Sequence, residues 1–255
     1  MILSRLGNKK RIANDIIQYF PPHDTFIDLF FGAGGMFFSK PLSKNNICND
    51  IDDDVFNLYT VIQSHKDDFI KEIELMPVNE SLFKYWKSNK ETDPIKKAVR
   101  FIKLSNFSYL GKGDMLLFGQ QSNINIKNKI FKNIENTIDF LNHAKFMCQD
   151  FRKVLPKISL PKKEDVFIYA DPPYLGTTNN YSSSFTETDT KDLFSILVES
   201  DIRFAISEFD SPMVLDLANN YKLNIITIGE RRNLKNLRTE ILITNYQRRQ
   251  MQLFT

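Results

Sequence analysis

The chain has 255 residues, of which 42% are hydrophobic, so it can form one large domain or a core domain that carries an insertion. Its formal net charge of +3 at pH 7 excludes a strongly basic protein and supports nucleic-acid binding only weakly. It has no apolar segment of about 20 residues, the length of a membrane-spanning helix, and its two cysteines match no zinc or redox spacing. We therefore expect a reduced, cytoplasmic protein that has no signal peptide and binds no metal.

The first quarter of the chain predicts two strands, each followed by a candidate ligand loop. The expected elements are, in order, a helix over residues 12–20, a strand over 25–30, a glycine-rich loop over 32–35 with a helix after it, a strand over 46–49 and an amphipathic helix over 55–62. A strand, a glycine loop and a helix in this order are typical of nucleotide-binding folds.

The glycine loop and Asp50 together favour a nucleoside ligand. Glycines let the backbone approach a ligand closely, and an acidic side chain at the end of the next strand can accept hydrogen bonds from ribose hydroxyls. The loop has neither a Gly-Lys-Ser/Thr segment nor the spacing of the dinucleotide fingerprint, which argues against a pyrophosphate group. Taken singly, the glycines are equally well explained as an ordinary turn, and Asp50 as a helix cap.

The segment from about residue 64 to 144 breaks this pattern. It carries charged residues, asparagines and scattered aromatic residues, with helical stretches such as residues 95–102 and a tight turn at 111–114. It shows no alternation of strands and helices. We expect an inserted, mostly helical module, with a hairpin around residues 111–130.

Strands and helices alternate again after residue 144. Strands are expected over residues 145–149, 166–170, 202–206, 223–228 and 240–246, with a helix around residues 193–197 between two of them. Such alternation predicts a parallel sheet with helices on both faces.

Asp171-Pro172-Pro173-Tyr174 is the most informative segment, because it directly follows the buried strand predicted for residues 166–170. The prolines end that strand, since neither can donate to a sheet ladder. They leave a carboxylate, a fixed carbonyl and an aromatic ring at the carboxyl end of the strand, where ligands bind in open α/β sheets. Two acceptors and a flat ring suit the exocyclic amine of a nucleobase. The alternative for Asp171 is a helix cap.

Six segments, in this order, make the chain resemble the Dam-type (D12 class) adenine-N6 DNA methyltransferases. They are Gly7-Asn8-Lys9, residues 28–35, Asn49-Asp50-Ile51, Asp171-Pro172-Pro173-Tyr174, Tyr181 with Ser184-Phe185-Thr186, and residues 240–246. The resemblance implies a Rossmann-like methyltransferase sheet of about seven strands. It also implies a catalytic domain over residues 1–63 and 145–255, with target recognition in residues 64–144.

The same resemblance implies S-adenosylmethionine as the cofactor and assigns the site. The cofactor-binding residues would be Arg5, Gly7, Lys9, Asp28, Phe30, Gly32, Gly34, Asp50, Ile51, Asp150, Phe151 and Asp171, and the catalytic residues Asp171, Pro172, Pro173 and Tyr174. Two positions depart from the family. Arg5 stands where an aromatic residue is frequent, and Asp28 where glutamate is commoner.

The implied activity is site-specific methylation of a flipped adenine in double-stranded DNA, in which Tyr174 stacks on the base and Asp171 and the Pro172 carbonyl bind its N6. The candidate DNA contacts are Lys10, Arg11, Arg100, Asn106, Tyr109, Lys112, Lys127, Tyr181, Arg231 and Arg232, each of which could equally be an ordinary surface residue. A restriction endonuclease that acts on the same site is a possible partner. The alternatives are an amino-methyltransferase of RNA or protein, and a catalytically silent DNA- or cofactor-binding module.

Overall fold

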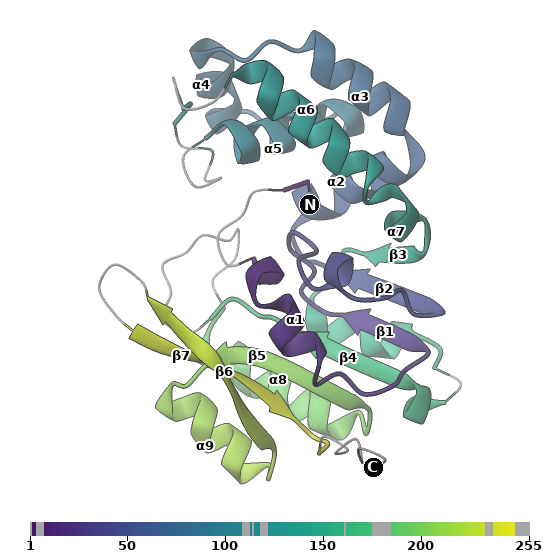
Figure 1. The fold of residues 1–255 in the computed structure, drawn as a ribbon, viewed down its shortest axis with the longest axis vertical. Helices are drawn as coiled ribbons and strands as arrows, with labels where there is room; N and C mark the ends of the chain where they lie inside the picture. The colour runs from purple at the N-terminus through teal and green to yellow at the C-terminus, as the bar shows by residue number, and fades with distance from the viewer. Residues whose placement is uncertain are drawn as a thin grey trace, which may run out of the picture.

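The computed structural model describes residues 2–3, 8–108, 113, 115–117, 122–160, 162–174, 185–232 and 237–247, with backbone only at 231, 232 and 237. The strands are β1 (Thr25–Asp28), β2 (Asn45–Asn49), β3 (Ala144–Met147), β4 (Val166–Ala170), β5 (Arg203–Phe209), β6 (Asn224–Arg232) and β7 (Leu237–Thr244). They form one seven-stranded sheet in the order β3-β2-β1-β4-β5-β7-β6 (Figure 1). The fold is therefore α/β, as predicted.

The prediction of a wholly parallel sheet is wrong at its last two strands. Strands β1 to β5 pair in parallel, whereas β7 lies antiparallel between β5 and β6. The reason is the short connection between Arg232 and Leu237, since parallel neighbours need a crossover of a dozen or more residues.

Strand β4 forms where it was predicted, because its five residues are all apolar or aromatic and suit a strand that is covered on both faces. All five are buried, and β4 lies between β1 and β5 in the centre of the sheet. Alternate side chains enter two cores: Phe167 and Tyr169 pack on one face, and Ile168 and Ala170 on the other. This centre fixes the position of Asp171, the next residue.

The α-helices are α1 (Ala13–Ile17), α2 (Asp53–Ser64), α3 (Lys66–Leu75), α4 (Glu80–Ser88), α5 (Pro94–Phe107), α6 (Asn123–Glu135), α7 (Ile138–Asn142), α8 (Glu187–Glu199) and α9 (Pro212–Asn220). Helices α3 to α6 gather beyond the β3 edge of the sheet, while α8 and α9 lie beside its other half (Figure 1). The core of helices α3 to α6 is continuous with one face of the sheet, because Phe69 and Trp86 belong to the same hydrophobic cluster as Phe26 and Tyr169. The division into a catalytic domain over residues 1–63 and 145–255 and a recognition segment over 64–144 stays a prediction.

Two local predictions are wrong. The helix expected after the glycine loop is only a short 3-10 turn over Phe37–Ser39, because Lys40 is extended before Pro41. The hairpin expected around residues 111–130 is wrong for residues 123–130, which are helical, while residues 111, 112, 114 and 118–121 lie outside the described residues; Ser108 and Leu116 form one isolated bridge. Helix α6 begins at Asn123 instead, capped by the Ser122 side chain. No helix in the described part of the chain is long and apolar enough to cross a membrane.

Candidate active site

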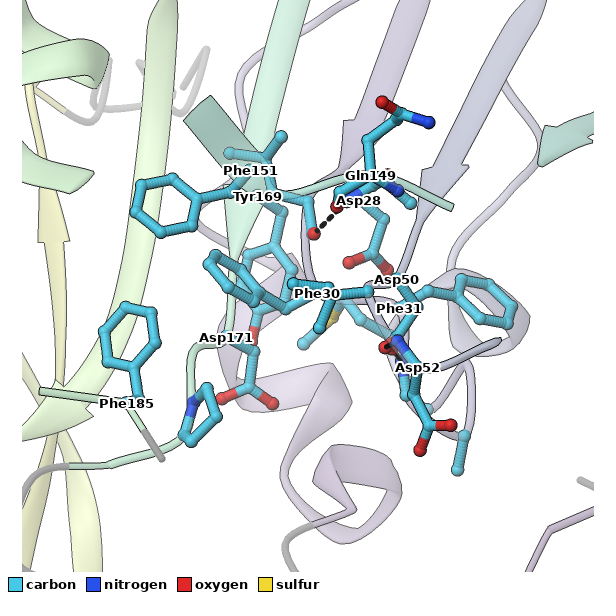
Figure 2. Close-up of a pocket in the computed structure, with 18 of the residues that line it drawn as sticks. Asp28, Phe30, Phe31, Asp50, Asp52, Gln149, Phe151, Tyr169, Asp171 and Phe185 are labelled. Atoms are coloured by element: carbon cyan, nitrogen blue, oxygen red, sulfur yellow. Dashed lines mark hydrogen bonds between the residues drawn. The ribbon is translucent and has the colours of Figure 1, made fainter. Parts of the chain in front are cut away.

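A cavity of about 170 Å³ lies at the carboxyl ends of β1 to β4 (Figure 2). Its lining comes from residues 28–33 and 35–36 after β1, 49–52 after β2, 149–152 after β3, and Tyr169, Asp171 and Pro173 at the end of β4, with Asn8, Lys9, Phe185 and Asp189 completing it. This is the sheet edge at which the sequence placed a ligand site. Parallel strands bring these loops together because their carboxyl ends all lie at one edge.

The glycine loop is held by Asp50. The Gly32 amide donates to Asp50 Oδ2 at 2.6 Å, and the Asp52 amide donates to Asp50 Oδ1 at 2.9 Å. Gly32 has φ +53° and Gly34 φ +70°, a backbone region that only glycine adopts readily. A carboxylate can accept about four hydrogen bonds, so Asp50 can support the loop and still bind a hydroxyl group.

Asp28, at the end of β1, is a buried carboxyl group. Its side chain is 2% exposed, and Oδ1 has no hydrogen-bond partner within the described residues. Burial raises the pKa of Asp28 well above its ordinary value, and the charges of Asp171 and Asp50 raise it further. The folded protein therefore holds a proton on Asp28 at pH values where the unfolded chain has lost it.

This proton makes stability depend on pH in a predictable direction. Between the unfolded pKa of 3.8 and the raised folded pKa, the folded state binds more protons, so its stability falls as the pH rises. Asp28→Asn removes the ionisable group and with it this loss of stability at high pH. We therefore expect the variant to raise the melting temperature by at least about 2 °C at pH 8 and to give little gain near pH 4. Thermal unfolding at both pH values measures this, with exposed Asp216→Asn as the control. A melting temperature that falls at pH 8 would contradict the burial argument.

Lys9 connects the amino terminus to the Asp171 segment. It lies in a 3-10 turn that begins at Asn8, whose side chain accepts from the Lys10 amide at 2.9 Å. Its side chain is 4% exposed, and Nζ lies 2.7 Å from Asp171 Oδ1 and 3.4 Å from Glu240 Oε1. The same ammonium lies 4.3 Å from the centroid of the Tyr174 ring. The structure thus brings Lys9, Asp171, Tyr174 and Glu240 together.

Gly35 lets this amino-terminal turn approach the glycine loop. A Cβ atom at position 35 would overlap Asn8 Oδ1 and lie 3.2 Å from the backbone nitrogens of Lys9 and Lys10. Glycine is therefore required here for space, although its φ is ordinary. Gly35 was predicted only as part of the glycine-rich loop, because the segment that packs on it is distant along the chain.

Three phenylalanine rings form one wall of the cavity. Phe30 and Phe151 lie 5.6 Å apart between centroids, Phe30 and Phe185 5.8 Å, and Phe151 and Phe185 5.9 Å. Figure 2 shows Phe151 and Phe185 on one side of the cavity and Asp50 and Asp52 on the opposite side. An apolar aromatic wall facing polar acceptors suits a ligand with a flat ring and hydroxyl groups.

Arg152 holds this wall in place by joining the β3 loop to the start of α8. Its guanidinium donates to Asp150 Oδ2 at 3.1 Å, to Asp189 Oδ1 at 2.5 Å and to Asp192 Oδ2 at 2.8 Å. Asp189 also completes a capping box with Thr186. Arg152, Phe185 and Asp189 were not predicted as site residues. The Thr-x-x-Asp capping pattern was a signal for the last of them.

The cavity is acidic. Besides the protonated Asp28, the side chains of Asp50, Asp52, Asp150, Asp171 and Asp189 line it, against Lys9 and Arg152, which are both already paired with carboxylates. This excess of negative charge would strengthen the binding of a cationic ligand and weaken the binding of an anionic one.

Most of the predicted cofactor residues meet at this cavity. Lys9, Asp28, Phe30, Gly32, Asp50, Ile51, Asp150, Phe151 and Asp171 line it, as does Pro173 of the catalytic segment. Gly34 lies apart from the lining, against the Phe38 and Phe31 rings. Pro172 is buried, and Tyr174 is partly buried beside the lining. Arg5 and Gly7 fall outside the described residues. The roles assigned to all these residues stay predictions.

The structure corrects two predicted DNA contacts. Arg100 is 8% exposed, and its Nη2 donates to the Trp86 carbonyl at 2.8 Å. The Asn106 side chain donates to the carbonyls of Ile2 and Ile102 at 3.1 and 3.0 Å. Both side chains are therefore engaged within the protein: Arg100 satisfies a buried carbonyl group, and the half-buried Asn106 satisfies two partly buried ones.

The other candidate DNA contacts are not decided by the structure. Lys10 and Arg11 are exposed beside Lys9, and Lys127 on α6 donates to the Glu74 carbonyl at 3.2 Å. Tyr109, Lys112 and Tyr181 lie outside the described residues, and Arg231 and Arg232 are described by their backbone alone, in β6.

We expect Arg100→Met to destabilise the protein without changing its affinity for duplex DNA. The variant leaves the Trp86 carbonyl without its donor, which costs about 1–3 kcal/mol and lowers the melting temperature by about 3–10 °C. Thermal unfolding and a DNA-binding titration test this, with Lys96→Met, exposed on the same helix, as the control. A loss of DNA affinity at an unchanged melting temperature would restore Arg100 as a DNA contact.

Comparison with known proteins gives a consistent result. The family model described as D12 class N6 adenine-specific DNA methyltransferase matches residues 6–234. The DNA adenine methylase of Escherichia coli (strain K12) is 25% identical over 245 residues, which cover 87% of this chain and 85% of that protein. The DNA adenine methylase of Haemophilus influenzae is 24% identical over 247 residues, with 87% and 84% covered.

One further relative and one solved structure complete the comparison. The Retron Ec67 DNA adenine methylase of Escherichia coli is 26% identical over 238 residues, which cover 86% of this chain and 81% of that protein. Among solved structures, an rRNA methylase from Streptococcus thermophilus aligns with 94% of this chain and 97% of its own, at 7% identity and a TM-score of 0.42.

Proposed function

This chain belongs to the D12 class of N6 adenine-specific DNA methyltransferases, and from that membership we propose how its residues divide the work of methyl transfer. The enzyme uses S-adenosylmethionine to methylate adenine N6 in DNA. The observation that best supports these proposed residue roles is the position of Asp171. It follows the central strand β4, faces the acidic cavity, and lies beside Tyr174 with Lys9 between them.

The negative charge and the aromatic wall of the cavity both suit the cofactor. S-adenosylmethionine carries a sulfonium and an ammonium group against one carboxylate, so it is a net cation and suits a lining rich in aspartates. Asp50 would accept from the ribose hydroxyls, and Asp150 with Phe151 would hold the adenine ring. Asp28 would gain a cationic partner for its buried carboxyl group. Lys9 would pair with the carboxylate of the cofactor.

Asp171 and Tyr174 would present the target base. The base has to leave the duplex, because its amino group is otherwise paired and inaccessible. Tyr174 then stacks on the adenine, while Asp171 and the Pro172 carbonyl accept hydrogen bonds from N6. These two acceptors turn the nitrogen lone pair toward the electrophilic methyl group that the sulfonium supplies. Orientation of this kind can contribute up to about 7–11 kcal/mol to a lower barrier.

Lys9 would couple the two binding events. In the structure its ammonium lies against Asp171 and over the Tyr174 ring, the two places that the target adenine must take. When Lys9 turns to the cofactor carboxylate, both places become available to the base. The base would therefore enter its site more readily after the cofactor than before it.

Sequence recognition is proposed for the helical segment from residue 64 to 144, with Lys10 and Arg11 beside the site as phosphate contacts. A DNA substrate favours action in the cytoplasm of a bacterial or phage-infected cell. A restriction endonuclease that acts on the same site remains a prediction.

The function is tested by expressing the chain in a methylation-deficient host and mapping N6-methyladenine by single-molecule sequencing. We expect one short motif to be methylated by the wild type and unmethylated by Asp171→Ala. Unmodified DNA, from soluble protein that binds S-adenosylmethionine, would point to another substrate or to a silent binding module.

A further inference from the structure

Glu240 lies at the base of the proposed target site, although it is outside the cavity lining and the sequence marked it only as the first residue of the last family segment. It is 1% exposed on β7 and lies directly opposite Phe209 on the antiparallel strand β5. Directly opposed residues of an antiparallel pair point to the same face of the sheet. Both of them contact Tyr174. Glu240 Oε1 accepts from the Tyr174 hydroxyl at 2.8 Å, and the Phe209 ring meets the Tyr174 ring at 4.5 Å and 75°.

The hydroxyl contact fixes the direction of the Tyr174 ring. Pro172 and Pro173 restrain the backbone that leads to Tyr174, but they leave its side-chain torsions to be set by packing. The hydroxyl oxygen lies on the axis of the second torsion, so its hydrogen bond to Glu240 restrains the first torsion, while the edge contact with the Phe209 ring restrains rotation of the Tyr174 ring about its own axis. Burial and the neighbouring carboxylates raise the pKa of the Tyr174 hydroxyl, so it stays protonated and can donate to Glu240.

A simpler role for Glu240 would be to neutralise Lys9. The distances favour Tyr174 as its main partner, because Lys9 Nζ is 3.4 Å from Glu240 but only 2.7 Å from Asp171. The sheet is also irregular at this point. The pairing of β6 with β7 shifts register between Thr227 and Gly229, next to Glu240. Such bulges re-aim side chains near active sites.

We propose that Glu240 is a positioning residue for methyl transfer: through the Tyr174 hydroxyl it holds the ring in the orientation that stacks on the flipped adenine. The proposal rests on the proposed function, since it takes Tyr174 as the stacking surface. Glu240 itself touches neither the base nor the cofactor.

Four variants separate this role from the alternatives. Glu240→Gln keeps an oxygen acceptor and removes the charge, whereas Glu240→Met keeps the volume and removes both. Tyr174→Phe removes only the hydroxyl, and the double variant Glu240→Met with Tyr174→Phe closes a thermodynamic cycle. Each is assayed for kcat, for the KM of the cofactor and of DNA that contains the mapped motif, and for stacking on 2-aminopurine at the target position.

We expect Glu240→Met to lower kcat about 10- to 100-fold, to weaken the quenching of 2-aminopurine, and to leave the cofactor KM within about threefold. Glu240→Gln should stay within about threefold of the wild type in kcat. Glu240→Met should add little to the loss already caused by Tyr174→Phe. Three results would overturn the proposal: a wild-type kcat in Glu240→Met, an equal loss in the presence and absence of the Tyr174 hydroxyl, or a Gln variant as impaired as the Met variant.

The contact can also be tested without any substrate. The 19F spectrum of 3-fluorotyrosine placed at position 174 reports the mobility of the ring, and Glu240→Met should narrow and shift its resonance while Glu240→Gln should not. Failure of the wild type to methylate DNA would reject the proposed function, whereas an unchanged 19F spectrum in Glu240→Met would reject the positioning role.

Discussion

Replacement of Asp171 by asparagine is expected to lower the rate of methyl transfer by at least about a thousandfold while the protein stays folded. The two side chains have nearly the same shape, so the packing after β4 is kept. The amide, however, offers N–H donors where the target amine needs an acceptor. N6 would then lose one of the two contacts that orient its lone pair. Single-turnover rates on the mapped DNA motif measure the loss.

Cofactor binding and stability provide the controls for Asp171→Asn. Lys9 keeps Glu240 as a partner in the variant, so we expect the melting temperature to stay within about 4 °C and the Kd for S-adenosylmethionine to stay within about tenfold. Asp201→Asn is the matched control, because position 201 is exposed with φ 58°, a conformation that asparagine tolerates well. An Asp171→Asn rate within tenfold of the wild type would remove Asp171 from the reaction.

Gly35→Ala is expected to lower kcat/KM about 100-fold, because a methyl group at this position pushes the turn that carries Lys9 away from the glycine loop. The added Cβ overlaps Asn8, and such overpacking costs about 1–3 kcal/mol when backbone has to move. We also expect the Kd for S-adenosylmethionine to rise about tenfold, because Lys9 is displaced. Titration calorimetry and steady-state kinetics measure the two effects.

Two other glycines make this test specific. A Cβ at Gly229 meets open space, so Gly229→Ala should behave as the wild type. A Cβ at Gly32 also meets nothing within 4 Å, but φ there is +53°, so Gly32→Ala should cost about 1–2 kcal/mol through strain alone. Wild-type kinetics in Gly35→Ala would mean that the amino-terminal turn can shift without loss of activity and that Lys9 does not need to be held in a fixed position.

The parallel half of the sheet could be predicted because its strands are short apolar runs with clear breaks. Strand β4 is the best example: five apolar or aromatic residues end at two prolines, and both the strand and its end follow from local rules. The antiparallel hairpin of β6 and β7 was predicted as two strands but in the wrong orientation. Its orientation depends on the length of the connection, and the strand ends could not be located closely enough from composition.

Arg100 and Glu240 show why charged residues were harder to place. Arg100 lies in a segment of mixed charge, which predicts a solvated helix, yet the fold turns it inward to meet the Trp86 carbonyl. Glu240 begins the apolar run that predicted the last strand but lies inside β7 in the structure, and its partners Lys9 and Tyr174 come from segments that are distant along the chain. No local pattern specifies such a contact.

The chemistry that each loop offers follows from local sequence: a glycine turn, acidic strand ends, and a carboxylate beside two prolines and a tyrosine. These features depend on residue type and on neighbours within a few positions, where backbone sterics and hydrogen-bonding capacity decide the outcome. Which side chains share one site depends instead on the packed fold, because burial and pairing arise where distant segments pack together. Three contacts are of that kind: the packing of the Lys9 turn against Gly35, the hydrogen bonds of Arg152 to the start of α8, and the hydrogen bond from Tyr174 to Glu240.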